Sequence, residues 1–233
     1  MGPLELEGHT LERAAILVEA TLPSLELSGY LQLDLGIPRT VLYAKAFQEG
    51  ELEAYILTRK APMLGRERPV LNLPVQIGSL VLTSPLLLEE QESGEHNGRP
   101  ILGSLGADAL NQRVLILDFP RQRLAFLEAF PDSLKARGFF APMETDPAGR
   151  PVLYAVHRGE KVRLLYDTGS SAFGLLTSRD RWEQLTTVRW WTRWMFPPGE
   201  TWSGYTEGTC GIRFRWVPWS FRWTVCTSWT CPA

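Results

Sequence analysis

Cysteine is nearly absent from this sequence of 233 residues, and its three cysteines all lie at or beyond Cys210. Disulfides therefore cannot hold the greater part of the chain, which is typical of proteins made in a reducing compartment. We also expect no secretory leader, because residues 1–7 are acidic and no positive segment precedes an apolar core. Both features favour a cytoplasmic protein.

Long apolar runs and an excess of one charge are missing too. No stretch of about 18 apolar residues, the length that crosses a bilayer, is present. The net charge is only −2, so we expect neither a membrane nor a nucleic acid as partner. His96 lies in a polar stretch, residues 91–99, without an acidic or cysteine partner at metal-binding spacing. We therefore expect no metal and no cofactor.

The most informative stretch that is present surrounds Asp167. An apolar run, residues 162–166, ends abruptly in Asp167, Thr168, Gly169 and Ser170. This pattern predicts a strand that delivers a carboxylate into a tight turn. Glycine lets the backbone turn back close to the carboxylate, and the hydroxyl residues can form hydrogen bonds around it. A further strand pair, residues 151–156 and 161–166, is expected to form the hairpin that leads into this turn.

A second copy of this layout lies near the N-terminus. Strand-like runs at residues 14–20 and 30–34 lead into Asp34, Leu35 and Gly36, and an apolar return follows. An isolated Asp-x-Gly usually marks only a turn. Its repetition in the same strand–turn–strand setting indicates an internal duplication.

A glycine-bearing strand between the two copies carries a third pattern. Leu105, Gly106, Ala107 and Asp108 precede a strand that ends in Leu117-Asp118-Phe119-Pro120. Only glycine permits a strand to pass close to another backbone, so Gly106 predicts close passage beside the Asp34 turn. We expect Asp108 to form structural hydrogen bonds and to start a short helix, without a role in catalysis.

Together these motifs resemble those of the aspartic proteases of the retropepsin and pepsin type, over about residues 14–185. The resemblance implies a mostly β, two-lobed fold of closed β-barrels, with an incomplete second lobe. It implies an aspartic-type endopeptidase, a hydrolase that cleaves peptide or protein substrates with Asp34 and Asp167 as its catalytic pair. The residues expected to support the active-site loops are Gly36, Thr168, Gly169 and Ser170. Residues 44–83, which include an expected hairpin at Gly78, occupy the place of the flap that closes over substrate.

Clusters of turn-forming residues and changes in composition predict how the chain divides into segments. Residues 1–128 form the N-terminal lobe, and residues 129–150, rich in proline and glycine, form a linker. Residues 151–187 begin the second lobe. Residues 188–233 form a tail of different composition, because the tail holds eight of the nine tryptophans and no leucine.

Two explanations of this tail stay open. Interleaved arginine and tryptophan are typical of a segment that lies at a membrane interface or stacks on nucleic acid. A GC-rich gene read out of frame also yields tryptophan, arginine and cysteine and loses leucine. The absence of any helical or alternating period favours the frameshift and predicts that the tail does not pack as a core.

Three functional hypotheses follow from the sequence. Leu35 stands where the family carries a threonine or serine whose hydroxyl braces the two loops, and Ser104 stands where an apolar residue is usual. The first difference favours a weak or inactive enzyme, or a non-catalytic binding module that keeps the fold. One lobe could also pair with a second chain, so both a monomer and a homodimer stay open.

Overall fold

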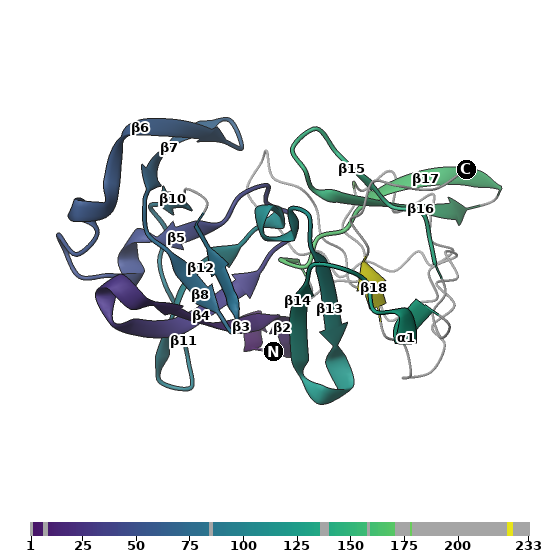
Figure 1. The fold of residues 1–233 in the computed structure, drawn as a ribbon, viewed down its shortest axis with the longest axis horizontal. Helices are drawn as coiled ribbons and strands as arrows, with labels where there is room; N and C mark the ends of the chain where they lie inside the picture. The colour runs from purple at the N-terminus through teal and green to yellow at the C-terminus, as the bar shows by residue number, and fades with distance from the viewer. Residues whose placement is uncertain are drawn as a thin grey trace.

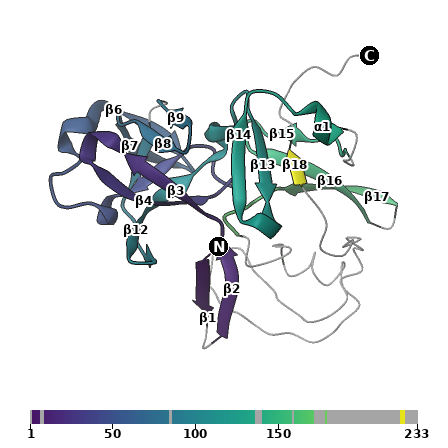
Figure 2. The same ribbon diagram turned by 60° about the horizontal axis from the view of Figure 1, so that its bottom comes forward.

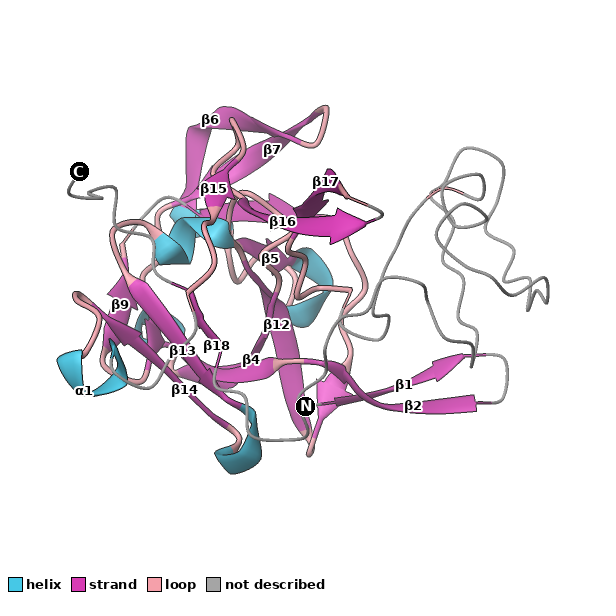
Figure 3. Ribbon diagram, turned by 90° about the vertical axis from the view of Figure 1, so that its right-hand side faces the viewer, coloured by secondary structure: helices cyan, strands magenta, loops and turns pink. Residues whose placement is uncertain are grey.

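The structure is a computed structural model that describes residues 2–6, 9–83, 86–135, 140–157, 159–170, 178 and 223–225. Over these residues the chain is mostly β, as the sequence predicts (Figure 3). Helical structure consists of one short α-helix, α1 (Asp132–Lys135), and several 3-10 turns. No helix in this part of the chain is long and apolar enough to cross a membrane.

One mixed sheet of ten strands forms the greater part of the fold (Figure 1). Its order is β6-β7-β10-β5-β12-β4-β3-β8-β9, with β11 beside β12. The pairs β12–β4 and β10–β5 are parallel, and the other pairs are antiparallel. The strands are β3 (Leu17–Leu22), β4 (Leu27–Leu33), β5 (Val41–Tyr43), β6 (Ile56–Met63), β7 (Arg66–Leu71), β8 (Val75–Ile77), β9 (Leu80–Leu82), β10 (Leu86–Glu89), β11 (Glu95–His96) and β12 (Arg99–Leu105).

The closed barrel expected from the resemblance is not formed by the described strands. The sheet runs from β6 to β9 as an open path, and these two end strands do not pair with each other. Closure needs strands long enough to tilt and to continue the hydrogen-bond ladder around the barrel. Here β8 and β9 have only three residues each and pair only with β3 and with each other.

Three smaller sheets accompany the large one. The hairpin of β1 (Gly2–Leu6) and β2 (His9–Ala15) stands away from the other sheets in Figure 2. The second sheet has the order β14 (Arg123–Leu127), β13 (Val114–Asp118) and β18 (Trp223–Val225). The third has the order β15 (Glu144–Thr145), β16 (Pro151–His157) and β17 (Glu160–Leu165).

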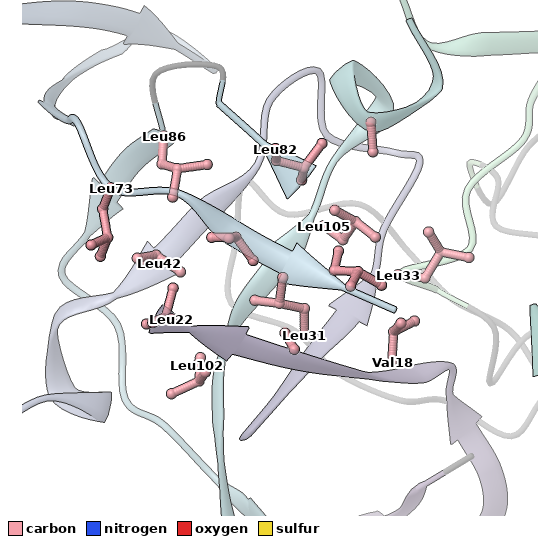
Figure 4. Close-up of a cluster of buried hydrophobic side chains, with 14 of the residues drawn as sticks. Val18, Leu22, Leu31, Leu33, Leu42, Leu73, Leu82, Leu86, Leu102 and Leu105 are labelled. Atoms are coloured by element: carbon pink, nitrogen blue, oxygen red, sulfur yellow. The ribbon is translucent and has the colours of Figure 1, made fainter. Parts of the chain in front are cut away.

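Leucine side chains fill the core of the large sheet (Figure 4). Leu31 and Leu33 on β4 lie on one face of the strand, and both are fully buried. Leu102 and Leu105 on the neighbouring strand β12 are fully buried as well. Burial of each such side chain contributes about 1.5–3 kcal/mol to stability. The strand that leads to Asp34 is therefore anchored in this leucine core.

The two predicted hairpins are both present. β3 pairs antiparallel with β4, which leads directly to Asp34, and β16 pairs antiparallel with β17, which leads to Asp167. The hairpin of β8 and β9 turns at Gly78, as expected. A longer hairpin, β6–β7, turns at Leu64 and Gly65, both with a positive φ. Three of these hairpins fold as their sequences indicate, and the β6–β7 hairpin was not predicted.

The glycine strand β12 passes between β4 and β5, so two backbones approach it closely. A Cβ atom at Gly106 would lie well inside 3.0 Å of the backbone of Arg39, and one at Gly103 would lie even closer to the carbonyl oxygen of Val41. Real Cβ atoms do not approach backbone so closely. The close passage predicted for Gly106 is therefore observed.

Replacement of Gly103 by alanine is expected to lower the free energy of unfolding by about 3 kcal/mol, because the new methyl group overlaps backbone that cannot move aside. Gly94→Ala is the matched control, since a Cβ there has only ordinary contact, 3.6 Å from Ile101. Urea denaturation of both variants measures the difference. Equal stability of the two variants would show that β5 yields to the methyl group.

Asp108 ties the glycine strand to the segment after the Asp34 turn. Its Oδ1 accepts hydrogen bonds from the backbone N–H of Thr40 at 2.9 Å and from the Thr40 hydroxyl at 2.7 Å. The expected helix start is wrong in detail, because the 3-10 turn Ala107–Leu110 has Gly106 as its N-cap residue and no side-chain cap. The carboxylate instead accepts the two hydrogen bonds from Thr40.

Ser104 stands where an apolar residue was expected, and a buried tyrosine explains it. The hydroxyls of Ser104 and Tyr43 lie 2.6 Å apart, and both residues are buried. Burial raises the pKa of Tyr43, which keeps its hydroxyl protonated and able to donate. A buried hydroxyl needs a partner, so the serine compensates for the tyrosine.

The predictions for the tail fall almost wholly outside the described residues. Only Trp223–Val225 is described, as β18, which pairs antiparallel with β13. At this point the tail backbone extends the sheet of the preceding segments. The prediction that the tail does not pack as a core otherwise concerns residues outside the described part of the chain.

Candidate active site

Asp34 and Asp167 come together, each against the glycine of the other loop. A Cβ atom at Gly36 would lie within 3.0 Å of the Asp167 carboxylate, and one at Gly169 within 3.0 Å of the Asp34 carboxylate. The relation is reciprocal, as expected for a duplicated strand–turn unit. Each glycine leaves the space in which the opposite carboxylate lies.

The two loops also share one pattern of internal hydrogen bonds. In the Asp34 loop, residues 34–37, the N–H of Gly36 donates to Oδ1 of Asp34 at 3.0 Å. In the Asp167 loop, residues 167–170, the N–H of Gly169 donates to Oδ1 of Asp167 at 2.9 Å. Such Asx turns follow directly from an Asp-x-Gly sequence after a strand. They fix both carboxylates by backbone donors.

Ser170 adds a donor that has no counterpart in the Asp34 loop. Its hydroxyl donates to Oδ2 of Asp167 at 3.0 Å, and its N–H lies 3.3 Å from Oδ1. The Asp167 carboxylate therefore accepts three hydrogen bonds within its own loop. Ionised carboxylates favour such donor-rich surroundings.

The environment of Asp34 favours its protonated form. Burial, then the negative charge of Asp167 and a hydrogen bond with that carboxyl group, raises the pKa of Asp34 to about 6, although the N–H groups of Gly36 and Ile37 oppose the rise. Two adjacent carboxylates cannot both ionise at low cost, so the pair retains one proton over a wide pH range. The geometry thus creates one acid and one base side by side.

The Thr168 hydroxyl connects the two loops, whereas Leu35, at the corresponding position of the Asp34 loop, has no hydroxyl to form the equivalent hydrogen bonds. The Thr168 hydroxyl donates to the carbonyl of Leu33 at 2.9 Å and accepts from the N–H of Leu35 at 2.9 Å. The side chain of Leu35 is fully buried among the leucines of the large sheet. The hydroxyl of Thr168 therefore bridges the two loops, whereas the side chain of Leu35 packs in the core and forms no such bridge.

The structural glycine strand contacts the site directly. The carbonyl of Leu105 accepts a hydrogen bond from the N–H of Asp34 at 2.9 Å, and the N–H of Gly106 donates to the Thr40 hydroxyl at 3.1 Å. Asp108 lies behind this hydroxyl and does not contact the carboxylate pair through any of its described hydrogen bonds. These hydrogen bonds attach the Asp34 loop and the segment that follows it to the glycine strand.

Two residues near the pair were missed by sequence reasoning. The Gln32 side chain donates to the carbonyl of Gly169 at 3.0 Å, and Arg150 Nη1 donates to the carbonyl of Gly36 at 3.2 Å. Gln32 lies within a strand and Arg150 within the expected linker, so no motif distinguishes either. Only the three-dimensional arrangement reveals them.

Within the described residues no group of three or more histidine, cysteine, aspartate or glutamate side chains could hold a metal ion. His96 packs edge-on against Tyr30, with ring centroids 5.2 Å apart. Comparison of the chain with protein-family models, with curated proteins and with solved structures found no match. Among the described residues, the carboxylate pair is therefore the feature that bears most directly on function.

Proposed function

We propose that the chain is an aspartic-type peptidase that hydrolyses peptide bonds with Asp34 and Asp167. The observation that supports this most directly is the reciprocal placement of each carboxylate over the glycine of the other loop. Paired carboxylates that share a proton are the acid–base unit of this class of enzyme. No metal or cofactor is needed for the reaction.

In the proposed mechanism a water molecule bound between the two carboxyl groups attacks the peptide carbonyl carbon. The Asp167 carboxylate accepts a proton from this water, while protonated Asp34 donates its proton to the carbonyl oxygen. A tetrahedral diol forms. Its collapse breaks the C–N bond, the amine nitrogen takes the proton from Asp167, and a diol hydroxyl returns a proton to Asp34. The pair ends as it began, with one proton.

The finer architecture belongs to the same proposal. The β3–β4 and β16–β17 hairpins represent two lobes related by duplication, the second of them incomplete. The β6–β7 hairpin is the better candidate for the flap, in place of the shorter hairpin at Gly78. Met63 at its end is buried against a cluster that includes Val41, and Leu64 at its tip is 65% exposed. An exposed apolar tip on an anchored hairpin is suited to contact a peptide.

A non-catalytic binding module is the second candidate, and Leu35 is the observation that favours it. The lost hydroxyl removes one of two brackets between the loops, and catalysis needs placement to within about 0.5 Å. A peptide analogue with a secondary alcohol in place of the scissile amide distinguishes the two. Binding of the analogue together with cleavage of the parent peptide supports the enzyme, and binding without cleavage supports the module.

Peptide cleavage by the purified full chain is expected to be greatest at acid pH and to fall about tenfold per pH unit above about 6. The reason is that the active pair holds one proton, and Asp34, with its pKa raised to about 6, loses that proton in this range. A mixed peptide library digested between pH 3 and pH 8 measures the profile. Cleavage that increases from pH 6 to pH 8 would contradict the proposal.

A further inference from the structure

The missing hydroxyl at position 35 leaves the two loops unequal, yet two other side chains cross between them. Gln32 reaches from β4 to the carbonyl of Gly169 in the Asp167 loop. Arg150, just before β16, reaches to the carbonyl of Gly36 in the Asp34 loop. The two hydrogen bonds cross the junction between the loops in opposite directions. Each ends on the carbonyl of the glycine that belongs to the other loop.

The Arg150 side chain is held in place before it reaches this junction. Its Nε donates to Oδ2 of Asp146 at 2.8 Å, and its Nη2 lies 2.7 Å from the same oxygen. The Asp146 side chain is only 8% exposed, and its Oδ1 accepts the N–H groups of Ala148 and Arg150 at 2.9 Å. Burial opposes ionisation of this carboxyl group, but these donors hold the pKa of Asp146 below its usual value. A planar guanidinium fixed in this way loses little entropy when Nη1 binds the Gly36 carbonyl.

Gln32 is held in place by its strand. It lies on β4 between the fully buried Leu31 and Leu33, opposite Leu17 of β3 and Ser104 of β12. Its amide is partly buried where it donates to Gly169 at 3.0 Å. A side chain that emerges from the centre of a packed sheet is a rigid support, so the Asp167 loop is fixed relative to the strand that carries Asp34.

We propose that Gln32 and Arg150 are positioning residues that hold the two Asp-x-Gly loops together and replace the bracket lost with Leu35. This inference deepens the proposed function and rests on it for its catalytic consequence. Without these two hydrogen bonds the described side chains that join the loops are the Thr168 hydroxyl and the carboxyl pair itself. The carboxylates then separate and admit water, so the burial of Asp34 and its interactions with Asp167, which raise the pKa of Asp34, all weaken.

The test is a comparison of the pKa of Asp34 in the full chain, measured by NMR titration of its carboxyl carbon. Gln32→Met and Arg150→Met remove the two donors and keep similar volume. We expect the pKa of Asp34 to fall by about one unit in Gln32→Met and by less in Arg150→Met, because the loss of a positive charge beside the pair acts in the opposite direction. Arg99→Met is the matched control, because Arg99 also pairs with a carboxylate, Glu19, and donates to a carbonyl, that of Gly29 at 3.4 Å. This control should leave the pKa of Asp34 unchanged.

Two conservative variants keep the test decisive if a methionine variant does not fold. Gln32→Asn retains the amide but is one methylene too short to reach Gly169. Arg150→Lys retains the charge beside Asp146 but loses the fork that serves Asp146 and Gly36 together. Gln32→Asn is expected to lower the pKa of Asp34 by a smaller amount than Gln32→Met, and Arg150→Lys, which keeps the positive charge, is expected to lower it through the lost hydrogen bond alone.

The outcomes separate this inference from the proposed function. An unchanged pKa of Asp34 in the Gln32 and Arg150 variants overturns it, and so does an equal fall in Arg99→Met. Where the wild type cleaves peptide, kcat should fall about tenfold in the Gln32 and Arg150 variants with little change in KM. If the pKa falls as expected but the wild type cleaves no peptide, the positioning role stands and the peptidase proposal fails.

Discussion

Exchange of Asp34 or of Asp167 for asparagine is expected to lower peptide cleavage by at least about a thousandfold. Each carboxyl group has a separate task, because one must accept a proton from water while the other donates to the carbonyl oxygen. An asparagine amide accepts the same backbone hydrogen bond in the Asx turn but cannot exchange a proton. Since the two residues act as one unit, the double variant should be no less active than either single variant.

The measurement is the initial rate of cleavage at acid pH for the wild type, the two single variants and the double variant. Asp132→Asn provides the control, because Asp132 lies on α1 in an exposed ion pair with Lys135. This control should retain full activity. Robust cleavage that survives both Asp34→Asn and Asp167→Asn would remove the aspartic-protease interpretation.

The strand–turn units could be predicted from the sequence because their determinants are local. An apolar run followed by Asp-x-Gly specifies a strand, an Asx turn and a returning chain within about ten residues. Gly106 could be predicted for a similar reason, since glycine within a strand indicates close approach of another backbone. The meeting of Asp34 and Asp167 was inferred from the repetition of these units.

The contacts that join the units could not be predicted, because they depend on tertiary placement. Gln32 and Arg150 are ordinary polar residues in sequence, and only the approach of the two loops gives them carbonyl partners. Ser104 is similar, since its polar character is explained only by the Tyr43 hydroxyl on the adjacent strand. The prediction of a closed barrel was wrong because the lengths of strands such as β8 and β9 depend on their neighbours in the sheet and not on the local sequence pattern.

The asymmetry of the two loops has a chemical consequence under the proposed mechanism. Three hydrogen bonds from within its loop stabilise the Asp167 carboxylate, two of them from Ser170. Asp34 lacks a side-chain donor of this kind in its own loop, and burial disfavours its charge. The proton that the pair shares is therefore expected on Asp34. This assignment leads to a prediction that does not require activity.

Asp34→Asn is expected to stabilise the protein at pH 8 by up to about 3 kcal/mol more than it does at pH 3. The pKa of Asp34 is raised from 3.8 to about 6 in the folded chain. A difference of one in pKa between the folded and unfolded chain corresponds to about 1.36 kcal/mol. A carboxyl group whose pKa is raised by folding contributes stability that is fully present below about pH 4. That contribution is lost as the pH rises through about 6. Asparagine carries no charge at either pH, so the variant avoids this loss.

Urea denaturation of the wild type and of Asp34→Asn at pH 3, 5, 6 and 8 measures the effect, and the difference between the two should develop mainly between pH 4 and pH 6. Glu92→Gln is the control, because it removes one negative charge from an exposed loop residue. It reports the effect of net charge alone. If Asp34→Asn instead loses stability relative to the wild type as the pH rises, Asp34 is stabilised as a carboxylate.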